Sequence, residues 1–205
     1  MSITKKELSL LLSKLSSFSQ RKANLEQYQT PSEIAADACW MAFLSDDLAG
    51  KIVADLGCGN GILGCGALAL GAHHVFFVDL DDSALRLAES NVLFLEKNLG
   101  TPFSRSFLHQ DAGSFLRNVD SILQNPPFGV QRKHADRPFL ASALRAHVAY
   151  SFHKLETREF VESFASQRHR TARLLKTYSF PLPRSMTFHK KRVYRVDVGL
   201  WRISK

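Results

Sequence analysis

The sequence predicts an α/β protein with a mostly parallel sheet, helices on both faces and an antiparallel strand at the C-terminal end. Three observations support this prediction. A short apolar run is followed at once by a glycine-rich turn and a helical segment, residues 51–70. Strand-like and helix-like segments then alternate through residue 167, which is typical of a parallel sheet. Residues 193–203 alternate between apolar and polar side chains, as expected for an antiparallel strand.

The composition is that of an ordinary globular protein. The chain has 205 residues, which suggests one large domain or two small ones, and 45% of them are hydrophobic, enough for a full core. No apolar run reaches the length of a membrane span and the first residues do not resemble a signal peptide, so we expect no membrane association. Cys39, Cys58 and Cys65 show no Cys-x-x-Cys spacing and cannot all pair. We therefore predict reduced thiols in a cytoplasmic protein, with no metal site and no disulfide framework.

The charge is divided unevenly along the chain. Residues 1–128 hold 10 Lys and Arg against 14 Asp and Glu, whereas residues 129–205 hold 17 against 5. Such asymmetry indicates that the second half faces a polyanion such as a nucleic acid. A basic surface that only keeps the protein soluble would fit the charge alone equally well.

Periodicity and turn residues predict the elements in order. Leucines at helical spacing predict an amphipathic helix over residues 3–18. Thr30-Pro31-Ser32-Glu33 predicts a capping box, with proline at the first position of a helix that runs to about Leu44. We expect strands at 51–56, 74–78, 105–108, 119–123 and 148–152, helices at 62–70, 83–98, 138–146 and 157–167, and an antiparallel pair at 171–180 and 193–203. One domain accounts for residues 1–205, with N-terminal helices in 1–48 and the sheet core in 49–205.

Acidic and glycine residues follow the first three predicted strands. Residues 57–61 form a Gly-x-Gly-x-Gly turn, which lets a ligand approach the backbone at a helix N-terminus. Asp79 lies about 20 positions further on, where an acidic residue commonly binds ribose hydroxyls. Asp79 could instead cap the next helix, but Asp81 and Asp82 can fill that role. Asp111 could accept a hydrogen bond from an adenine amine, or could simply stabilise a turn.

The segment Gln124-Asn125-Pro126-Pro127-Phe128 follows the fourth strand and predicts chemistry on an exocyclic amine. The lone pair of such an amine is delocalised into the base, so an enzyme must bind both amine hydrogens to free it. The side-chain oxygen of Asn125 and the carbonyl of Pro126 can do this, and the prolines stiffen the loop. Phe128 offers a face on which a flipped base can stack. The alternative is a surface Asn-Pro turn followed by a buried phenylalanine.

These segments together resemble class I S-adenosylmethionine (SAM) methyltransferases that modify amino groups, which have a Rossmann-like fold. The resemblance sharpens on residues 25–30 (LEQYQT), 55–61 (DLGCGNG), 125–129 (NPPFG), 150–154 (YSFHK), 157–159 (TRE) and 188–191 (FHKK). These residues resemble the methyltransferase-like protein 5 family, which methylates adenine N6 in small-subunit ribosomal RNA. The loop 131–139 is similar to archaeal members. Gln124 departs from the family pattern, which has an apolar residue there.

The resemblance implies roles for individual residues. It implies that residues 25–30 fold over the SAM cofactor and that Asn125, Pro126, Pro127 and Phe128 are catalytic. It also implies a small zinc-binding activator subunit that pairs with an exposed sheet edge, so that any zinc belongs to that partner. The predicted cofactor-binding residues are Gln27, Tyr28, Thr30, Asp55, Gly57, Cys58, Gly59, Asn60, Gly61, Asp79, Leu80, Asp111, Ala112 and Asn125.

The predicted substrate is an unpaired adenine in RNA, held by basic loops. The predicted RNA-binding residues are Arg132, Lys133, His134, Lys190, Lys191 and Arg192. For His153 we expect RNA contact or packing and not acid–base catalysis, because methyl transfer from a sulfonium needs no strong base. The same catalytic motif also fits guanine-N2 methylation of RNA or methylation of a protein glutamine amide. A non-catalytic RNA-binding scaffold is the alternative from another class.

Overall fold

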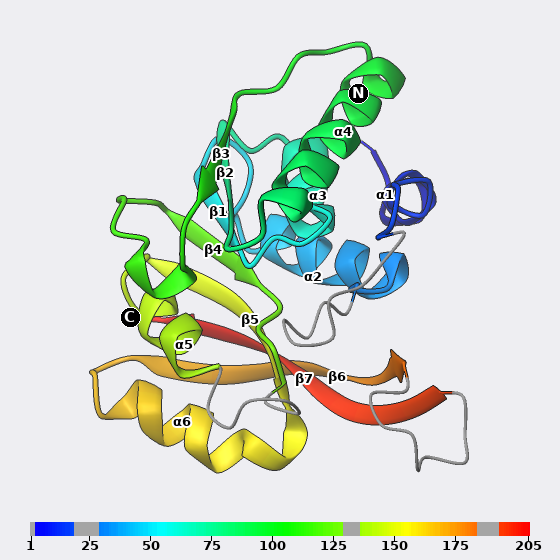
Figure 1. Ribbon diagram of the computed structural model, residues 1–205. Helices are drawn as coiled ribbons and strands as arrows, with labels where there is room; N and C mark the ends of the chain where they lie inside the picture. Colours follow the sequence, from blue (N-terminus) through cyan, green and yellow to red (C-terminus); the bar gives the residue numbers. More distant parts are fainter. Residues whose placement is uncertain (1–2, 19–28, 129–135, 184–192) are drawn as a thin grey trace.

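The computed structural model describes residues 3–18, 29–128, 136–183 and 193–205 (Figure 1). The strands in these ranges are β1 (Ile52–Leu56), β2 (His74–Asp79), β3 (Arg105–His109), β4 (Ser121–Gln124), β5 (Val148–Lys154), β6 (Thr171–Pro183) and β7 (Val193–Ser204). The helices are α1 (Lys5–Leu12), α2 (Ser32–Leu44), α3 (Ile62–Ala69), α4 (Asp82–Leu99), α5 (Arg137–Ala143) and α6 (Arg158–Ser166), with short 3-10 turns η2 (Ala112–Ser114) and η3 (Leu155–Thr157).

The strands form a seven-stranded sheet in the order β3-β2-β1-β4-β5-β7-β6. Strands β1 to β5 pair in parallel, whereas β7 lies between β5 and β6 and is antiparallel to both. The predicted fold class, a mostly parallel Rossmann-like sheet with an antiparallel C-terminal pair, is confirmed. Since β1 pairs with β2 on one side and β4 on the other, its carboxyl end lies between theirs, where open α/β sheets bind ligands.

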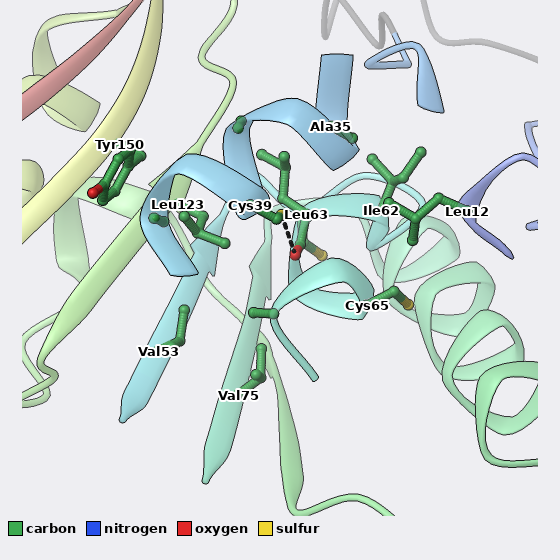
Figure 2. Packing of buried hydrophobic residues seen from close by; sticks show 14 of the residues in the cluster. Leu12, Ala35, Cys39, Val53, Ile62, Leu63, Cys65, Val75, Leu123 and Tyr150 are labelled. Carbon is green, nitrogen blue, oxygen red and sulfur yellow. Dashed lines mark hydrogen bonds between the residues drawn. The ribbon is translucent and has the colours of Figure 1, made fainter. Parts of the chain in front are cut away.

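Two apolar clusters cover the two faces of the sheet. Neighbouring strand residues point to opposite faces, so Val53 belongs to one cluster and Ala54 to the other. The first cluster packs β1, β2, β4 and β5 against α1, α2, α3 and α4, and the second packs the opposite face against α5 and α6 (Figure 1). Figure 2 shows part of the first cluster, in which the Cys39 thiol of α2 donates to the carbonyl oxygen of Leu63 in α3 at 3.5 Å. The contact of α2 with α3 is therefore close and specific.

The predicted N-terminal elements need two corrections. The first helix ends at Leu12 and not near residue 18, and Thr4 and Glu7 form a reciprocal capping box at its start. The capping box predicted at Thr30 is wrong, because α2 begins at Ser32 after Pro31 and makes no side-chain cap bond. The hydroxyl of Thr30 has a distant partner instead, Asn125. The end of α2 at Leu44 is as predicted.

The remaining boundaries differ from the predictions by a few residues. Strand β6 extends to Pro183 and β2 includes Asp79 as its last residue, while α5 ends earlier, at Ala143. None of the helices in the described ranges is both long enough and apolar enough to span a bilayer.

Candidate active site

Three predicted segments meet at the carboxyl ends of adjacent strands. The glycine loop follows β1, Asp79 ends β2 and Asn125 follows β4. In the parallel ladders Leu56 of β1 is level with Val78 of β2 and with Gln124 of β4. The sheet therefore brings the residues predicted to bind cofactor and the residue predicted to be catalytic to the carboxyl ends of its strands, as expected from the sequence.

The glycine loop has conformations that only glycine adopts easily. Gly57, Gly59 and Gly61 have φ values of 65°, 56° and 78°. A Cβ on Gly57 would lie 2.8 Å from Phe139, and one on Gly61 would lie 2.9 Å from Ala88. Among the described residues, a Cβ on Gly59 would meet only the Phe18 ring, at 3.7 Å. Packing thus requires glycine at the two outer positions, whereas the backbone at Gly59 stays approachable.

Asp79 is fixed by backbone donors. Its Oδ2 accepts from the Gly59 N–H at 2.9 Å and its Oδ1 from the Asp81 N–H at 2.9 Å. Burial raises the pKa of Asp79 above its ordinary value, against these hydrogen bonds, which lower it. The alternative role as a helix cap belongs to Asp81, whose side chain accepts from the Ser83 N–H. Asp79 is therefore an oriented carboxyl group joined to the glycine loop.

Asp55, near the end of β1, and Cys58, in the glycine loop that follows, are both buried. Asp55 Oδ2 accepts from the Gly64 N–H at 2.8 Å, and burial, with the charge of Asp79 as a smaller cause, raises the pKa of Asp55 to about 8. Burial also raises the pKa of the Cys58 thiol well above its usual range. Neither group is exposed enough to reach a ligand with its side chain here, so their predicted cofactor role stays a prediction.

A pair of asparagines ties the segment after α1 to the glycine loop. Asn60 Nδ2 donates to the carbonyl of Ser16 at 3.1 Å. Asn91 of α4 donates to the carbonyls of Ser16 and Asn60 and accepts from the Ser16 N–H. The Asn60 side chain, predicted to bind cofactor, thus has a structural partner. Sequence reasoning missed Asn91, although a polar residue on the apolar stripe of α4 was a signal.

Three further predicted cofactor-binding residues, Asp111, Ala112 and Leu80, are less distinctive. Asp111 caps the turn η2 by accepting from the Gly113 N–H at 2.8 Å, which is the alternative considered for it. Ala112 is buried, whereas Leu80 is 57% exposed beside the Asp79 carboxyl. Leu80 is therefore the residue here that offers free apolar surface, and cofactor contacts by all three stay predictions.

Asn125 has one satisfied end and one open end. Its Nδ2 donates to Thr30 Oγ1 at 3.0 Å. Its Oδ1 is buried and has no hydrogen-bond partner among the described residues. An acceptor in this state is rare in folded proteins, and it is what an amine substrate would satisfy.

Phe128 is buried in this structure. Its ring centroid lies 5.6 Å from that of Phe180 in β6, in an edge-to-face contact, and it belongs to the first apolar cluster. This arrangement matches the alternative given above, in which a buried phenylalanine follows the Asn-Pro turn. Base stacking on Phe128 would require the ring to become accessible and stays a prediction.

A buried polar chain that the sequence did not predict lies beside Asn125. Gln124 Nε2 donates to the Phe139 carbonyl at 3.2 Å and to Ser151 Oγ at 2.9 Å. Ser151 Oγ lies 2.6 Å from His153 Nε2, and His153 Nδ1 lies 3.7 Å from Asp136 Oδ2. His153 is thus packed in the interior, one of the two roles expected for it. The one departure from the family motif, Gln124, was the signal available in the sequence.

Eight predicted site residues lie outside the described residues. They are the cofactor-binding Gln27 and Tyr28 and the RNA-binding Arg132, Lys133, His134, Lys190, Lys191 and Arg192. Their assignments stay predictions.

Comparison with known proteins decides the family. Residues 35–149 match the family described as the methyltransferase small domain. The chain belongs to this family. A Drosophila melanogaster relative named rRNA N(6)-adenosine-methyltransferase Mettl5 is 33% identical, covering 90% of this chain and 89% of the relative. A Danio rerio relative named rRNA N(6)-adenosine-methyltransferase METTL5 is 31% identical over 97% of this chain and 98% of the relative, so this chain is METTL5-like.

A solved structure shares the whole fold of this METTL5-like chain. PH1948 from Pyrococcus horikoshii, proposed to be an RNA methyltransferase, is 40% identical, covers 100% of this chain and 99% of its own, and gives a TM-score of 0.87. This chain is a methyltransferase, and SAM is its cofactor. The described residues fit that cofactor, since the approachable Gly59, the oriented Asp79 carboxyl and the exposed Leu80 lie together at the sheet edge.

Proposed function

We propose that this chain methylates N6 of an unpaired adenine in ribosomal RNA, with the small subunit as its target. The observation that supports this most is the buried Asn125 Oδ1, an acceptor without a partner among the described residues, next to the glycine loop. The names of the METTL5 relatives from fly and zebrafish support adenine N6 and ribosomal RNA. The resemblance of the catalytic motif and of the flanking segments supports the small subunit.

The residues of the site account for the chemistry. When bound, SAM supplies an activated methyl group on a sulfonium. Gly57, Gly59 and Asp79 would hold this cofactor, with Asp79 accepting from ribose hydroxyls. Asn125 Oδ1 and the Pro126 carbonyl accept the two hydrogens of the adenine amine, which turns the nitrogen lone pair toward the methyl group. The site works by positioning, and the described part of it contains no residue that must act as a strong base.

The decisive experiment identifies the methylated nucleoside. The protein is incubated with isotope-labelled SAM and cellular RNA, and the labelled nucleoside is identified by mass spectrometry. We expect N6-methyladenosine and a loss of most turnover in Asn125→Ala with nearly unchanged SAM affinity, because Asn125 contacts the amine. Asn118→Ala is the control, at an exposed asparagine just before β4 and thus near the amino ends of the strands, opposite the site. Label in guanosine or in protein, or turnover within a few-fold of wild type in Asn125→Ala, would contradict the proposal.

We also propose that a small zinc-binding activator subunit adds a strand to the edge of this sheet. Strand β3 lies at one edge, and none of its five residues is buried. Strand addition would pair its outer backbone groups and cover its side chains. Purified alone, the chain should be poorly soluble or weakly active, and the partner should correct this. A monodisperse and fully active lone chain would refute the idea.

The proposed location is the cytoplasm, which the three free cysteines support.

A further inference from the structure

Thr30 contacts the catalytic amide from a segment 95 residues away in the chain. Its hydroxyl is 3.0 Å from Asn125 Nδ2, and the residue is 3% exposed. The role that the sequence suggested for this hydroxyl, capping α2, is not the one it has, because α2 has no side-chain cap bond. Its hydroxyl is therefore available to Asn125.

The position of Thr30 is set by a rigid neighbour. Pro31 follows it with φ −56° and leads directly into α2. Ala35, Ala36 and Cys39 of α2 are buried, and the Cys39 thiol is bonded to α3 (Figure 2). The hydroxyl is thus presented to Asn125 by a packed helix whose neighbour α3 begins at the end of the glycine loop.

The two ends of the Asn125 amide are not equivalent for the proposed reaction. An adenine amine brings two N–H donors, so it needs the oxygen end and would be repelled by the NH₂ end. A threonine hydroxyl can bond either end, but only one arrangement satisfies all groups once the amine is present. In that arrangement Nδ2 lies on Thr30 and Oδ1 faces the amine, and the structure already has Nδ2 on Thr30.

We propose that Thr30 is a positioning residue for methyl transfer, which holds Asn125 so that its oxygen faces the target amine. This inference rests on the proposed function of Asn125. It differs from the cofactor-binding role that the resemblance implies for Thr30, and the two roles affect different measurements. A positioning role acts on kcat through Asn125, whereas a cofactor role acts on SAM affinity.

The test compares three threonine variants in the full chain. Thr30→Val keeps the shape but removes the hydroxyl, and Thr30→Ser keeps the hydroxyl. Thr101→Val is the control and removes an exposed hydroxyl in the connection before β3, toward the amino ends of the strands. At saturating SAM and RNA we expect Thr30→Val to lower kcat by about three- to tenfold, the effect of one lost hydrogen bond, with SAM affinity by calorimetry unchanged. Thr30→Ser should restore most of the activity, and Thr30→Val should add nothing in an Asn125→Ala background.

The outcomes separate the inference from the function beneath it. A wild-type kcat in Thr30→Val would overturn the inference. So would a Thr30→Val variant that binds SAM more weakly and regains full activity at saturating SAM. If Asn125→Ala itself retained turnover, the proposed function would fail first. If Thr30→Val does not fold, the side-chain amide protons of Asn125 are compared by NMR in the wild-type protein and in Thr30→Ala. Markedly faster exchange with water in Thr30→Ala supports the bond to Thr30, and unchanged exchange refutes it.

Discussion

Removing the Ser151 hydroxyl should destabilise the protein more than removing the whole amide of Gln124. Ser151 is the central member of the buried chain, with Gln124 Nε2 at 2.9 Å on one side and His153 Nε2 at 2.6 Å on the other. Ser151→Ala therefore leaves two buried groups short of a partner. A buried polar group without a partner costs about 1–3 kcal/mol. Because Gln124 keeps its bond to the Phe139 carbonyl, we expect a total of about 2–4 kcal/mol.

Gln124→Met changes more atoms but leaves fewer groups unsatisfied. The substitution removes two donated hydrogen bonds and also removes Oε1, which is buried without a partner among the described residues. Ser151 and His153 remain bonded to each other. Replacing a buried polar group by an apolar one of similar shape costs little when its partners stay bonded elsewhere, so we expect a loss below about 1.5 kcal/mol. Small domains have only about 5–15 kcal/mol of stability, so the two variants should be easy to tell apart.

Urea unfolding followed by circular dichroism measures the difference. Ser179→Ala, which removes an exposed hydroxyl on β6, is the matched control and should lie within about 0.5 kcal/mol of wild type. Equal m-values would show that the variants differ in stability and not in the surface exposed on unfolding. If Gln124→Met lowered the free energy of unfolding as much as Ser151→Ala or more, the hydrogen bonds of Ser151 would not contribute the stability expected of them.

Three further predictions concern the cofactor, the substrate and pH. Asp79→Ala should weaken SAM binding at least tenfold in calorimetry, because a carboxylate bonded to two hydroxyls makes bonds worth about 1.5–3 kcal/mol each; unchanged affinity would remove Asp79 from the site. Neutralising Arg132 and Lys133 should weaken RNA binding and flatten its salt dependence without affecting SAM, and a salt slope that does not change would count against them. In the folded state the pKa of Asp55 is about 8, whereas the pKa of an unfolded aspartate is about 3.9. The free energy of unfolding should therefore fall as pH rises between these values, and Asp55→Asn should reduce that decline in urea titrations.

The sheet and the main site positions could be predicted because their signals are local in sequence. Each strand ends in a turn residue, and parallel strands place all such ends at one edge, so the glycine loop, Asp79 and Asn125 had to meet. The sequence offered Asp81 and Asp82 as caps of the next helix, and the structure gives this role to Asp81, two residues before Ser83. Element ends were less predictable. Residues 13–18 keep an apolar pattern after α1 ends, since Leu15 is buried by tertiary contacts and not by helix continuation.

The polar contacts that shape the site could not be predicted, because each joins residues distant in the chain. Thr30-Pro31-Ser32-Glu33 has the local pattern of a capping box, and local patterns cannot show that an amide from the other half of the chain will take the hydroxyl. The same holds for Asn60 and Asn91, which meet at Ser16. A short polar side chain bonds to the partner that the fold brings to it, and that partner is fixed only when the helices have packed.

This distinction bears on how the site works. The backbone of the glycine loop and the Pro126 carbonyl have positions set by strand ends and proline, so they are present whenever the sheet forms. Asn125 differs, because its side chain has two ends and several rotamers. Among the described residues its hydrogen-bond partner is Thr30, which leads into α2. Catalysis by positioning is sensitive to small displacements of the reacting groups. The packing of α2 on α3, far from the amine in sequence, is therefore expected to affect turnover through Thr30 and Asn125 without a direct contact to the substrate.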